Sequence, residues 1–295
     1  MKRTAQILTL LLILASTVSA NAQLLWKISG KDAAKPSWIF GTHHLAPVSV
    51  LESTPGFDNA FKSAETIYGE IDMSLLEDPA TQMKMVSYVL APADSTLSKV
   101  LDPNSLATID RMLKEGGLPV TAAALEQLKP ASVSNTIAAI YSQKAFPGFN
   151  PEQQLDKTIQ KMARENAKQV RGLESLESQL DLLFGTPVAR QAEGLKKLLE
   201  DPEKTVGQIH SLADAYLAAD LNGLAELIAE AQNDGMTEEE ARLLLENRNR
   251  AWLDILIGAI PTASILIVVG AGHLPGDTGL ISLLRNAGYT VEPVK

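Results

Sequence analysis

Two short segments near opposite ends of the 295-residue chain place a histidine three residues after a glycine. One is Gly41-Thr42-His43-His44, which follows the apolar residues 38–40, and the other is Gly270-Ala271-Gly272-His273, which follows the apolar residues 266–269. Neutral imidazole is a common ligand of zinc-like metals, and histidine carries protons near neutral pH. A single histidine after a strand is often a packed core residue, but the repeated pattern predicts a metal or catalytic site formed by both segments.

A carboxylate follows a third apolar segment. Glu70 lies in residues 66–71, and a strand there would place Glu70 and Asp72 on one face. If this strand neighbours the one ending at Gly41, Glu70 meets His44. Two histidines with one carboxylate form a recognised divalent-metal site that leaves positions open for water. The alternatives are that Glu70 is a solvated residue at the sheet edge, or a general base that works without metal.

Arg248 gives an independent indication of a site. A helix predicted over residues 237–257 opens with a capping box, and Arg248 shares an apolar face of this helix with Trp252. An arginine on such a face needs a carboxylate, an anion or carbonyl oxygens as its partner. The candidate partners are Glu70, Glu174 and a substrate. A structural ion pair or a snorkelling side chain would explain the same pattern without a function.

The elements that must position these residues are predicted from short apolar runs bounded by glycine. Six strands are expected, at residues 24–28, 38–41, 66–71, 169–173, 264–270 and 289–294. Helices are expected at 151–166, 176–183, 188–199, 205–231 and 237–257. The pattern predicts an α/β (α+β) fold with a central mixed sheet flanked by helices and a long helical insertion at about residues 75–165. In open α/β sheets, ligands bind beyond the carboxyl ends of the strands, where the histidines and Glu70 would lie.

The first 22 residues have the features of a secretory signal peptide. Lys2 and Arg3 precede an apolar stretch, and the small residues Ala20-Asn21-Ala22 fit a cleavage site. The apolar stretch is shorter than a bilayer span requires, so no stable membrane span is expected after cleavage. The sequence contains no cysteine for lipid attachment or a disulfide bond. We therefore expect residues 23–295 to form a single domain in the periplasm or the medium.

The composition excludes several classes of protein. The formal net charge of −9 argues against a groove that follows nucleic-acid phosphates, so no nucleic-acid partner is expected. The sequence has no P-loop, no nucleophile-elbow pattern, no HExxH zinc motif and no dinucleotide-binding glycine pattern. The expected partner is a peptide or a small-molecule substrate.

Five motifs occur in an order that resembles the TraB/GumN family. They are Gly41-Thr42-His43-His44, Gly69-Glu70-Ile71-Asp72, Gly172-Leu173-Glu174 with Glu177 and Gln179, Arg248-Asn249-Arg250-Ala251-Trp252, and Gly270-Ala271-Gly272-His273. That family includes the Tiki metalloproteases, and its wider clan is similar to erythromycin esterase and the haem-binding ChaN proteins. The resemblance covers nearly all of the chain after residue 22.

The resemblance implies a metal-dependent hydrolase of the Tiki type, in which His44, His273 and Glu70 hold a divalent ion such as Zn, Mn or Co. His43 competes with His44 for the role of first ligand. A divalent ion lowers the pKa of a bound water and polarises a carbonyl group. Arg248 would then stabilise an oxyanion or hold a substrate carboxylate, and Glu174 would orient a histidine or Arg248.

The expected function is therefore that of a periplasmic or secreted peptidase. Three other functions fit the same residues. A haem- or iron-binding protein would use the histidines as axial ligands. An inactive relative would bind a peptide without cleaving it. An ester or lactone hydrolase would use the same metal chemistry on a different bond.

Overall fold

A computed structural model describes residues 23–295 of the chain, apart from residues 34 and 234. The predicted signal peptide at residues 1–22 lies outside the described residues. A six-stranded sheet has the order β4-β3-β5-β2-β1-β6. Its strands are β1 (Leu25–Ser29), β2 (Ser37–Thr42), β3 (Thr66–Gly69), β4 (Gln169–Gly172), β5 (Ile265–Gly270) and β6 (Thr290–Pro293). Each strand begins and ends within two residues of its predicted segment.

The sheet is mixed, so the predicted fold class is confirmed. Strands β4, β3, β5 and β2 run parallel to one another, whereas β1 runs antiparallel to both of its neighbours, β2 and β6. In the β2–β5 pair, Gly41 lies opposite Val269 and Thr42 lies opposite Gly270. The two glycine-histidine segments, far apart in the sequence, therefore leave the same edge of the sheet side by side.

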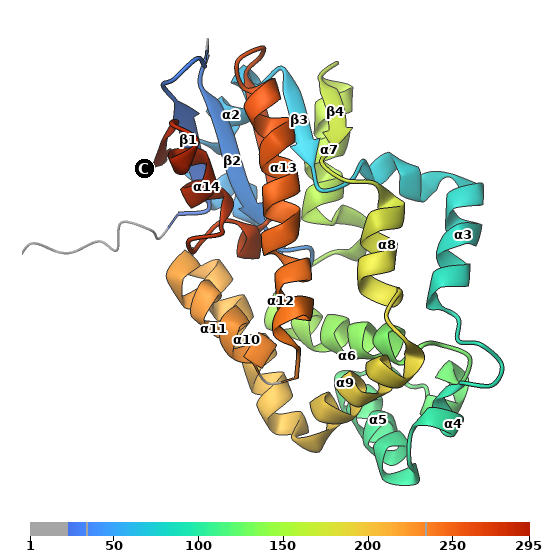
Figure 1. Ribbon diagram of the computed structural model, residues 1–295. Helices are drawn as coiled ribbons and strands as arrows, with labels where there is room; N and C mark the ends of the chain where they lie inside the picture. The colour runs from blue at the N-terminus through green and yellow to red at the C-terminus, as the bar shows by residue number, and fades with distance from the viewer. Residues whose placement is uncertain (1–22, 34, 234) are drawn as a thin grey trace, which may run out of the picture.

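Helices cover both faces of the sheet (Figure 1). Helices α13 (Glu246–Ala259) and α14 (Leu280–Asn286) cross in front of the strands in this view, and α2 (Phe57–Ser63) and α7 (Leu155–Glu165) lie behind them. Because both faces are covered, strand β5 is a nearly continuous run of buried aliphatic residues, of which 265–269 are at most 1% exposed.

The remaining helices form a second body below the carboxyl ends of the parallel strands in Figure 1. Before β4 these are α3 (Pro79–Val89), α4 (Leu97–Val100), α5 (Pro103–Gly116) and α6 (Pro130–Ala145), with 3₁₀ turns at Met73–Glu77, Ala122–Leu125 and Pro151–Gln153. The short helix α1 (Ser49–Ser53) is not part of this body, because its Val50 belongs to the core of the sheet. After β4 come α8 (Leu176–Phe184), α9 (Val188–Glu200), α10 (Pro202–Leu217), α11 (Leu221–Asn233) and α12 (Glu238–Leu244). A 3₁₀ turn, Ala271–His273, follows β5.

The helices before and after β4 share one hydrophobic core. Buried Ile109, Leu113 and Val133 from the stretch before β4 pack in one cluster with Leu195 and Leu199 of α9. Helix α7, in contrast, packs on the sheet, because its buried Leu155, Ile159 and Ala163 belong to the main core. The helical body thus combines segments that precede and follow β4 in the chain, whereas α7 belongs to the layer on the sheet.

Two of the predicted helices are broken, so the prediction of their continuity was wrong. The segment 205–231 is interrupted at Ala219, which has a φ of 54°, and the Asp220 carboxylate then accepts the N–H of Gly223 at 3.0 Å. The segment 237–257 is interrupted at Leu245, where the backbone leaves the helical region. At the second break Arg248 Nη1 donates to the Leu244 carbonyl oxygen at 3.1 Å. The apolar periodicity alone does not reveal these side-chain hydrogen bonds with the backbone.

Within the described part of the chain, none of the helices has the length and the apolar character that crossing a bilayer requires.

Gly69, at the end of β3, is expected to be intolerant of a side chain. A Cβ atom there would overlap Gln160 Nε2 and lie 2.9 Å from the Ile71 carbonyl oxygen. We expect Gly69→Ala to lower the free energy of unfolding by about 1–3 kcal/mol in urea denaturation, because the Gln160 side chain and the backbone at Ile71 would have to shift to make room for the methyl group.

Gly258 provides the matched control. It lies in α13, and a Cβ atom there meets nothing within 4 Å. Gly258→Ala should stabilise the protein by up to about 1 kcal/mol through helix propensity. Equal effects of the two substitutions would contradict the packing explanation.

Candidate functional site

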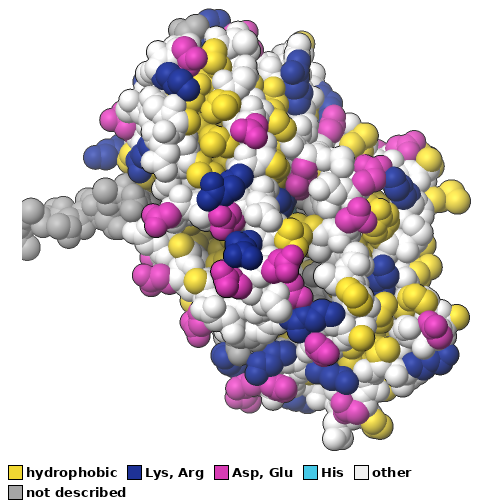
Figure 2. All heavy atoms as spheres, in the orientation of Figure 1, with side chains coloured by type: hydrophobic (Ala, Val, Ile, Leu, Met, Phe, Trp, Pro, Cys, Tyr) yellow, Lys and Arg dark blue, Asp and Glu magenta, His cyan; other side chains and the backbone are white. Residues whose placement is uncertain are grey.

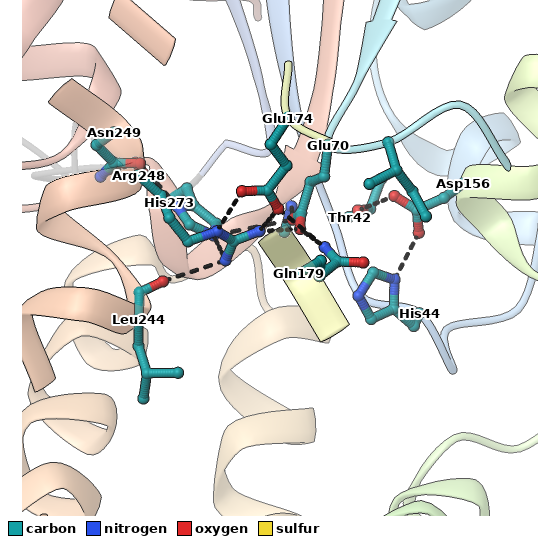
Figure 3. Close-up of polar contacts among 12 residues, drawn as sticks. Thr42, His44, Glu70, Asp156, Glu174, Gln179, Leu244, Arg248, Asn249 and His273 are labelled. Atoms are coloured by element: carbon teal, nitrogen blue, oxygen red, sulfur yellow. Dashed lines mark hydrogen bonds and ion pairs between the residues drawn. The ribbon is translucent and has the colours of Figure 1, made fainter. Parts of the chain in front are cut away.

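The centre of the candidate site is the guanidinium group of Arg248, which contacts two glutamates (Figure 3). Nη2 lies 2.6 Å from Glu70 Oε2 and 2.6 Å from Glu174 Oε1, and Nε donates to Glu174 Oε2 at 3.1 Å. Glu70 follows β3, Glu174 follows β4, and Arg248 projects from α13. The structure therefore brings together all three residues that the sequence predicts as catalytic, and both predicted carboxylate partners of Arg248 contact it.

These three charges are shielded from water. The side chain of Arg248 is 15% exposed, and those of Glu70 and Glu174 are each 10% exposed. The guanidinium also lies 4.6 Å from the centre of the Trp252 ring, which favours a cation. Two carboxylates against one guanidinium leave this buried group with an excess negative charge.

Two further donors hold the carboxylate of Glu70. The Nε2 group of Gln179, on α8, donates to Glu70 Oε2 at 3.0 Å and to Glu174 Oε1 at 3.1 Å, and the N–H of Gly270 donates to Glu70 Oε1 at 2.9 Å. Burial alone would raise the pKa of Glu70. The ring of His273, which is positively charged only below about pH 4, and the guanidinium of Arg248, together with the Gly270 hydrogen bond, outweigh burial and hold the pKa at about 2.

His273 has a defined tautomer. Asn249 donates through Nδ2 to the carbonyl oxygens of His273 and Thr278, at 3.3 and 2.9 Å, so its Oδ1 faces His273 Nδ1 at 2.7 Å. An amide oxygen accepts hydrogen bonds, and therefore the ring proton lies on Nδ1. Nε2 consequently carries a lone pair, which accepts a hydrogen bond from Arg248 Nη1 at 3.0 Å. Burial lowers the pKa of His273 to about 4.

His44 lies apart from this network. Its Nδ1 is 3.0 Å from Asp156 Oδ2, and the other oxygen of Asp156 accepts from Thr42 Oγ1 at 2.8 Å. The side chain of His44 is 63% exposed, whereas that of Asp156 is 7% exposed. The Asp156 carboxylate raises the pKa of His44 to about 9. The ring of His44 thus projects into open space from a buried anchor.

His43 points in another direction. Its ring packs against Phe146 and Tyr216, with centroid distances of 4.5 and 5.6 Å, and its Nδ1 accepts the N–H of Leu45 at 3.2 Å. Burial lowers the pKa of His43 to about 4. Of the two neighbouring histidines, His44 faces the outside of the sheet edge and His43 belongs to an aromatic cluster.

The glycines of both segments permit close packing of the backbone rather than an unusual φ. A Cβ atom at Gly270 would lie 3.2 Å from Glu70 Oε1, and one at Gly41 would lie 3.1 Å from Ala271. Glycine at these positions lets the ends of β2 and β5 approach each other and lets Glu70 reach the Gly270 amide.

The predicted metal ligands are only partly assembled. Glu70 Oε1 lies 3.8 Å from His273 Nε2, but His44 is paired with Asp156. Among the described residues, no three His, Asp or Glu side chains form a ready-made metal-binding group. The chemistry of the donors nevertheless fits a divalent ion, because His273 presents an unprotonated nitrogen and the carboxylates around it exceed the positive charge.

Sequence reasoning assigns no role to Asp156, Asn249 or Gln179. A role for Asp156 could have been predicted, because it lies with Gln160 on the otherwise apolar face of a helix, where polar side chains need partners. Asn249 is 1% exposed directly beside Arg248, yet its contact with His273 joins residues 24 positions apart.

Comparison with known proteins identifies the family. The model of the TraB/PrgY/gumN family matches residues 24–293. The chain belongs to this family. A zebrafish (Danio rerio) protein named Metalloprotease TIKI2 is 23% identical over 316 aligned positions, which cover 91% of this chain and 60% of that protein. The chain therefore spans about 60% of the length of that relative. No solved structure gives a significant match.

Arg248→Met should leave two carboxylates buried without a cation. We expect a loss of about 3–5 kcal/mol in the free energy of unfolding at pH 7, measured in urea. In the wild type, Glu70 has a lowered pKa, so its pairing stabilises the fold above pH 4.5 and is lost as the pH falls towards 2. The deficit of Arg248→Met should therefore be largest near neutral pH and should shrink towards pH 4.

Arg250→Met is the matched control, since Arg250 lies on the same helix, is exposed and, among the described residues, forms its ion pair with Glu246 four residues earlier. Its effect should stay below about 1 kcal/mol. A similar cost for both substitutions would contradict the special role of Arg248.

The pairing of His44 with Asp156 predicts a pH dependence. In the metal-free protein, the His44 ring should titrate near pH 9 by NMR, against an ordinary value of 6.5, and Asp156→Asn should lower that pKa. Because the pKa is raised in the folded state, the pair stabilises the fold fully below about pH 6.5 and loses this contribution as the pH rises through 9. Titration of His44 near 6.5 in both proteins would contradict the ion pair.

Proposed function

We propose that the protein is a metal-dependent hydrolase that cleaves peptide bonds. The observation that carries the proposal is the pair formed by Glu70 and His273, in which a carboxylate oxygen lies 3.8 Å from an unprotonated ring nitrogen at the carboxyl edge of the sheet. The family membership, and the name of the zebrafish relative, support the same chemistry. The proposed ligands are His44, Glu70 and His273.

A divalent ion such as Zn, Mn or Co would supply an acidified water and would polarise the carbonyl group of the substrate. The residues of the chain prepare the site for it. Asn249 keeps the proton of His273 on Nδ1, so that Nε2 stays available. Asp156 anchors the ring of His44, and ligation by His44 requires that the ring lose its proton.

Arg248 and Glu174 act as a unit in the proposed reaction. The two hydrogen bonds with Glu174 fix the plane of the guanidinium, so that Nη1 and Nη2 point towards His273 and Glu70. All five N–H groups of Arg248 have partners in this structure, so Arg248 would bind a carbonyl oxygen only after a cation at His273 Nε2 had freed one N–H of Nη1, while the bonds with Glu174 held the guanidinium in place. Gln179 supports the arrangement by keeping the two glutamates at a fixed separation.

We also propose that the enzyme acts on peptides in the periplasm or outside the cell, because residues 1–22 have the pattern of a signal peptide.

The experiment is elemental analysis of the purified protein followed by turnover of a mixed peptide library, with and without a chelator. His44→Ala and His273→Ala should each lower bound metal and peptide turnover by about tenfold or more, because each removes one of three protein ligands. Circular dichroism should show a folded chain in both.

His210→Ala is the control, since His210 lies exposed on α10 and should leave metal content and turnover unchanged. Wild-type metal content in both ligand variants would refute the proposed site. Strong visible absorbance of the purified protein, without turnover, would favour haem binding instead.

A further inference from the structure

A cavity of about 440 Å³ lies in the helical body, between α6, α8, α9, α10 and α12. Much of its wall is aliphatic, with contributions from Leu182, Leu195, Leu198 and Leu244. Leu183, Met236 and Leu243, three large apolar side chains that are exposed to solvent, also line it. Figure 2 shows the surface hollowed between α12 and α8 on this side of the molecule. A volume of this size holds a few amino-acid side chains.

Among the described residues that line the cavity, the charged side chains are paired, and Lys197 forms an ion pair with Glu200. Arg190 donates to both oxygens of Glu240 at 2.8 and 2.6 Å and also contacts Glu193. The other polar lining groups include the uncharged side chains of Ser134, Asn135 and Gln208. The buried Nε2 of Gln208 has no hydrogen-bond partner among the described residues, and rotation of this amide would offer a donor to a carbonyl oxygen.

The cavity adjoins the Arg248 network through a single residue. The side chain of Leu244 lines the cavity, and its carbonyl oxygen accepts from Arg248 Nη1 at 3.1 Å. In Figure 3 this side chain points away from the charged groups while the carbonyl faces them. The cavity therefore borders the same residue whose carbonyl oxygen contacts Arg248, so an extended peptide bound at Arg248 would reach it within a few residues.

We propose that this cavity is a subsite for apolar side chains of a neutral peptide, a few residues from the bond positioned at Arg248. Aliphatic walls suit leucine-like side chains, and the amide and hydroxyl groups suit the polar backbone of a peptide. A fatty acyl chain cannot form hydrogen bonds with those amide groups, and covering the amides with an acyl chain would cost free energy. The inference rests on the proposed peptidase function and specifies its substrate class.

Gly194 offers a way to fill the cavity without disturbing its wall. It lies on α9 among the lining residues, and a Cβ atom there meets nothing within 4 Å. Gly194→Phe should place its ring in the cavity. The matched control is Gly258→Phe, at an equally open helical glycine on α13 outside the cavity lining. Leu183→Ser, at an exposed rim position, gives a second variant that leaves the buried core intact.

The test is fluorescence anisotropy with two labelled neutral hexapeptides, one with two central leucines and one with two central serines, in the presence of chelator so that no cleavage occurs. The wild type and Gly258→Phe should bind the leucine peptide about tenfold more tightly than the serine peptide. Gly194→Phe should lose this preference, and Leu183→Ser should reduce it about threefold.

Equal binding of both peptides by the wild type would overturn the subsite, as would an unchanged preference in folded Gly194→Phe and Leu183→Ser. Displacement of the leucine peptide by dodecanoate at a lower concentration than by unlabelled peptide would overturn the peptide in favour of an acyl chain. The anisotropy assay measures binding and not turnover, so it tests the subsite separately from the proposed hydrolysis. If the protein shows no peptidase activity but prefers the leucine peptide, and Gly194→Phe abolishes that preference, the subsite is supported and only the hydrolysis is refuted.

Discussion

The arrangement of the site depends on how the buried positive charge of Arg248 is paired with its neighbours. A guanidinium that is 15% exposed must recover its lost hydration from neighbouring groups, and here it does so from Glu70, Glu174, His273 and the Leu244 carbonyl. Those partners come from the ends of three adjacent parallel strands and from the break between α12 and α13. Satisfying one cation therefore fixes the relative positions of the sheet edge and of the helix that covers it. Two glutamates exceed the single positive charge of the guanidinium, so the centre has an excess of negative charge that would favour the second cation of the proposed function.

The repeated glycine-histidine pattern produces two different histidines, because the surroundings of each ring differ. His273 is 4% exposed, receives its orientation from Asn249 and has a lowered pKa. His44 is exposed, is anchored by Asp156 and has a raised pKa. Near neutral pH in the metal-free state, one ring is thus a neutral acceptor and the other a cation. Environments that separate the pKa values of similar groups are typical of sites where protons are exchanged or metals displace them.

Local sequence patterns were sufficient to predict the strands, the edge of the sheet at which the site lies and the carboxylate partners of Arg248. Each of these follows from the period of apolar residues or from the cost of burying a charge. The hydrogen bonds that define the site could not be predicted in the same way. The tautomer of His273 depends on which way the Asn249 amide faces, and this is fixed by the carbonyl oxygen of Thr278. The shared core of the helices before and after β4 likewise depends on contacts between residues more than fifty positions apart.

The lone pair of His273 Nε2 can serve only one strong partner at a time, and in this structure the partner is Arg248 Nη1. Any other cation that binds this nitrogen must displace Nη1. It need not disturb the bonds with Glu174, because these are made by Nε and Nη2. Arg248 would then keep its position and gain one donor without a partner, directed at the place where His273 and Glu70 meet. An N–H donor that is already held in the required orientation needs little reorganisation to form a new hydrogen bond, so the arginine that holds this network together is also suited to bind an oxygen of the substrate.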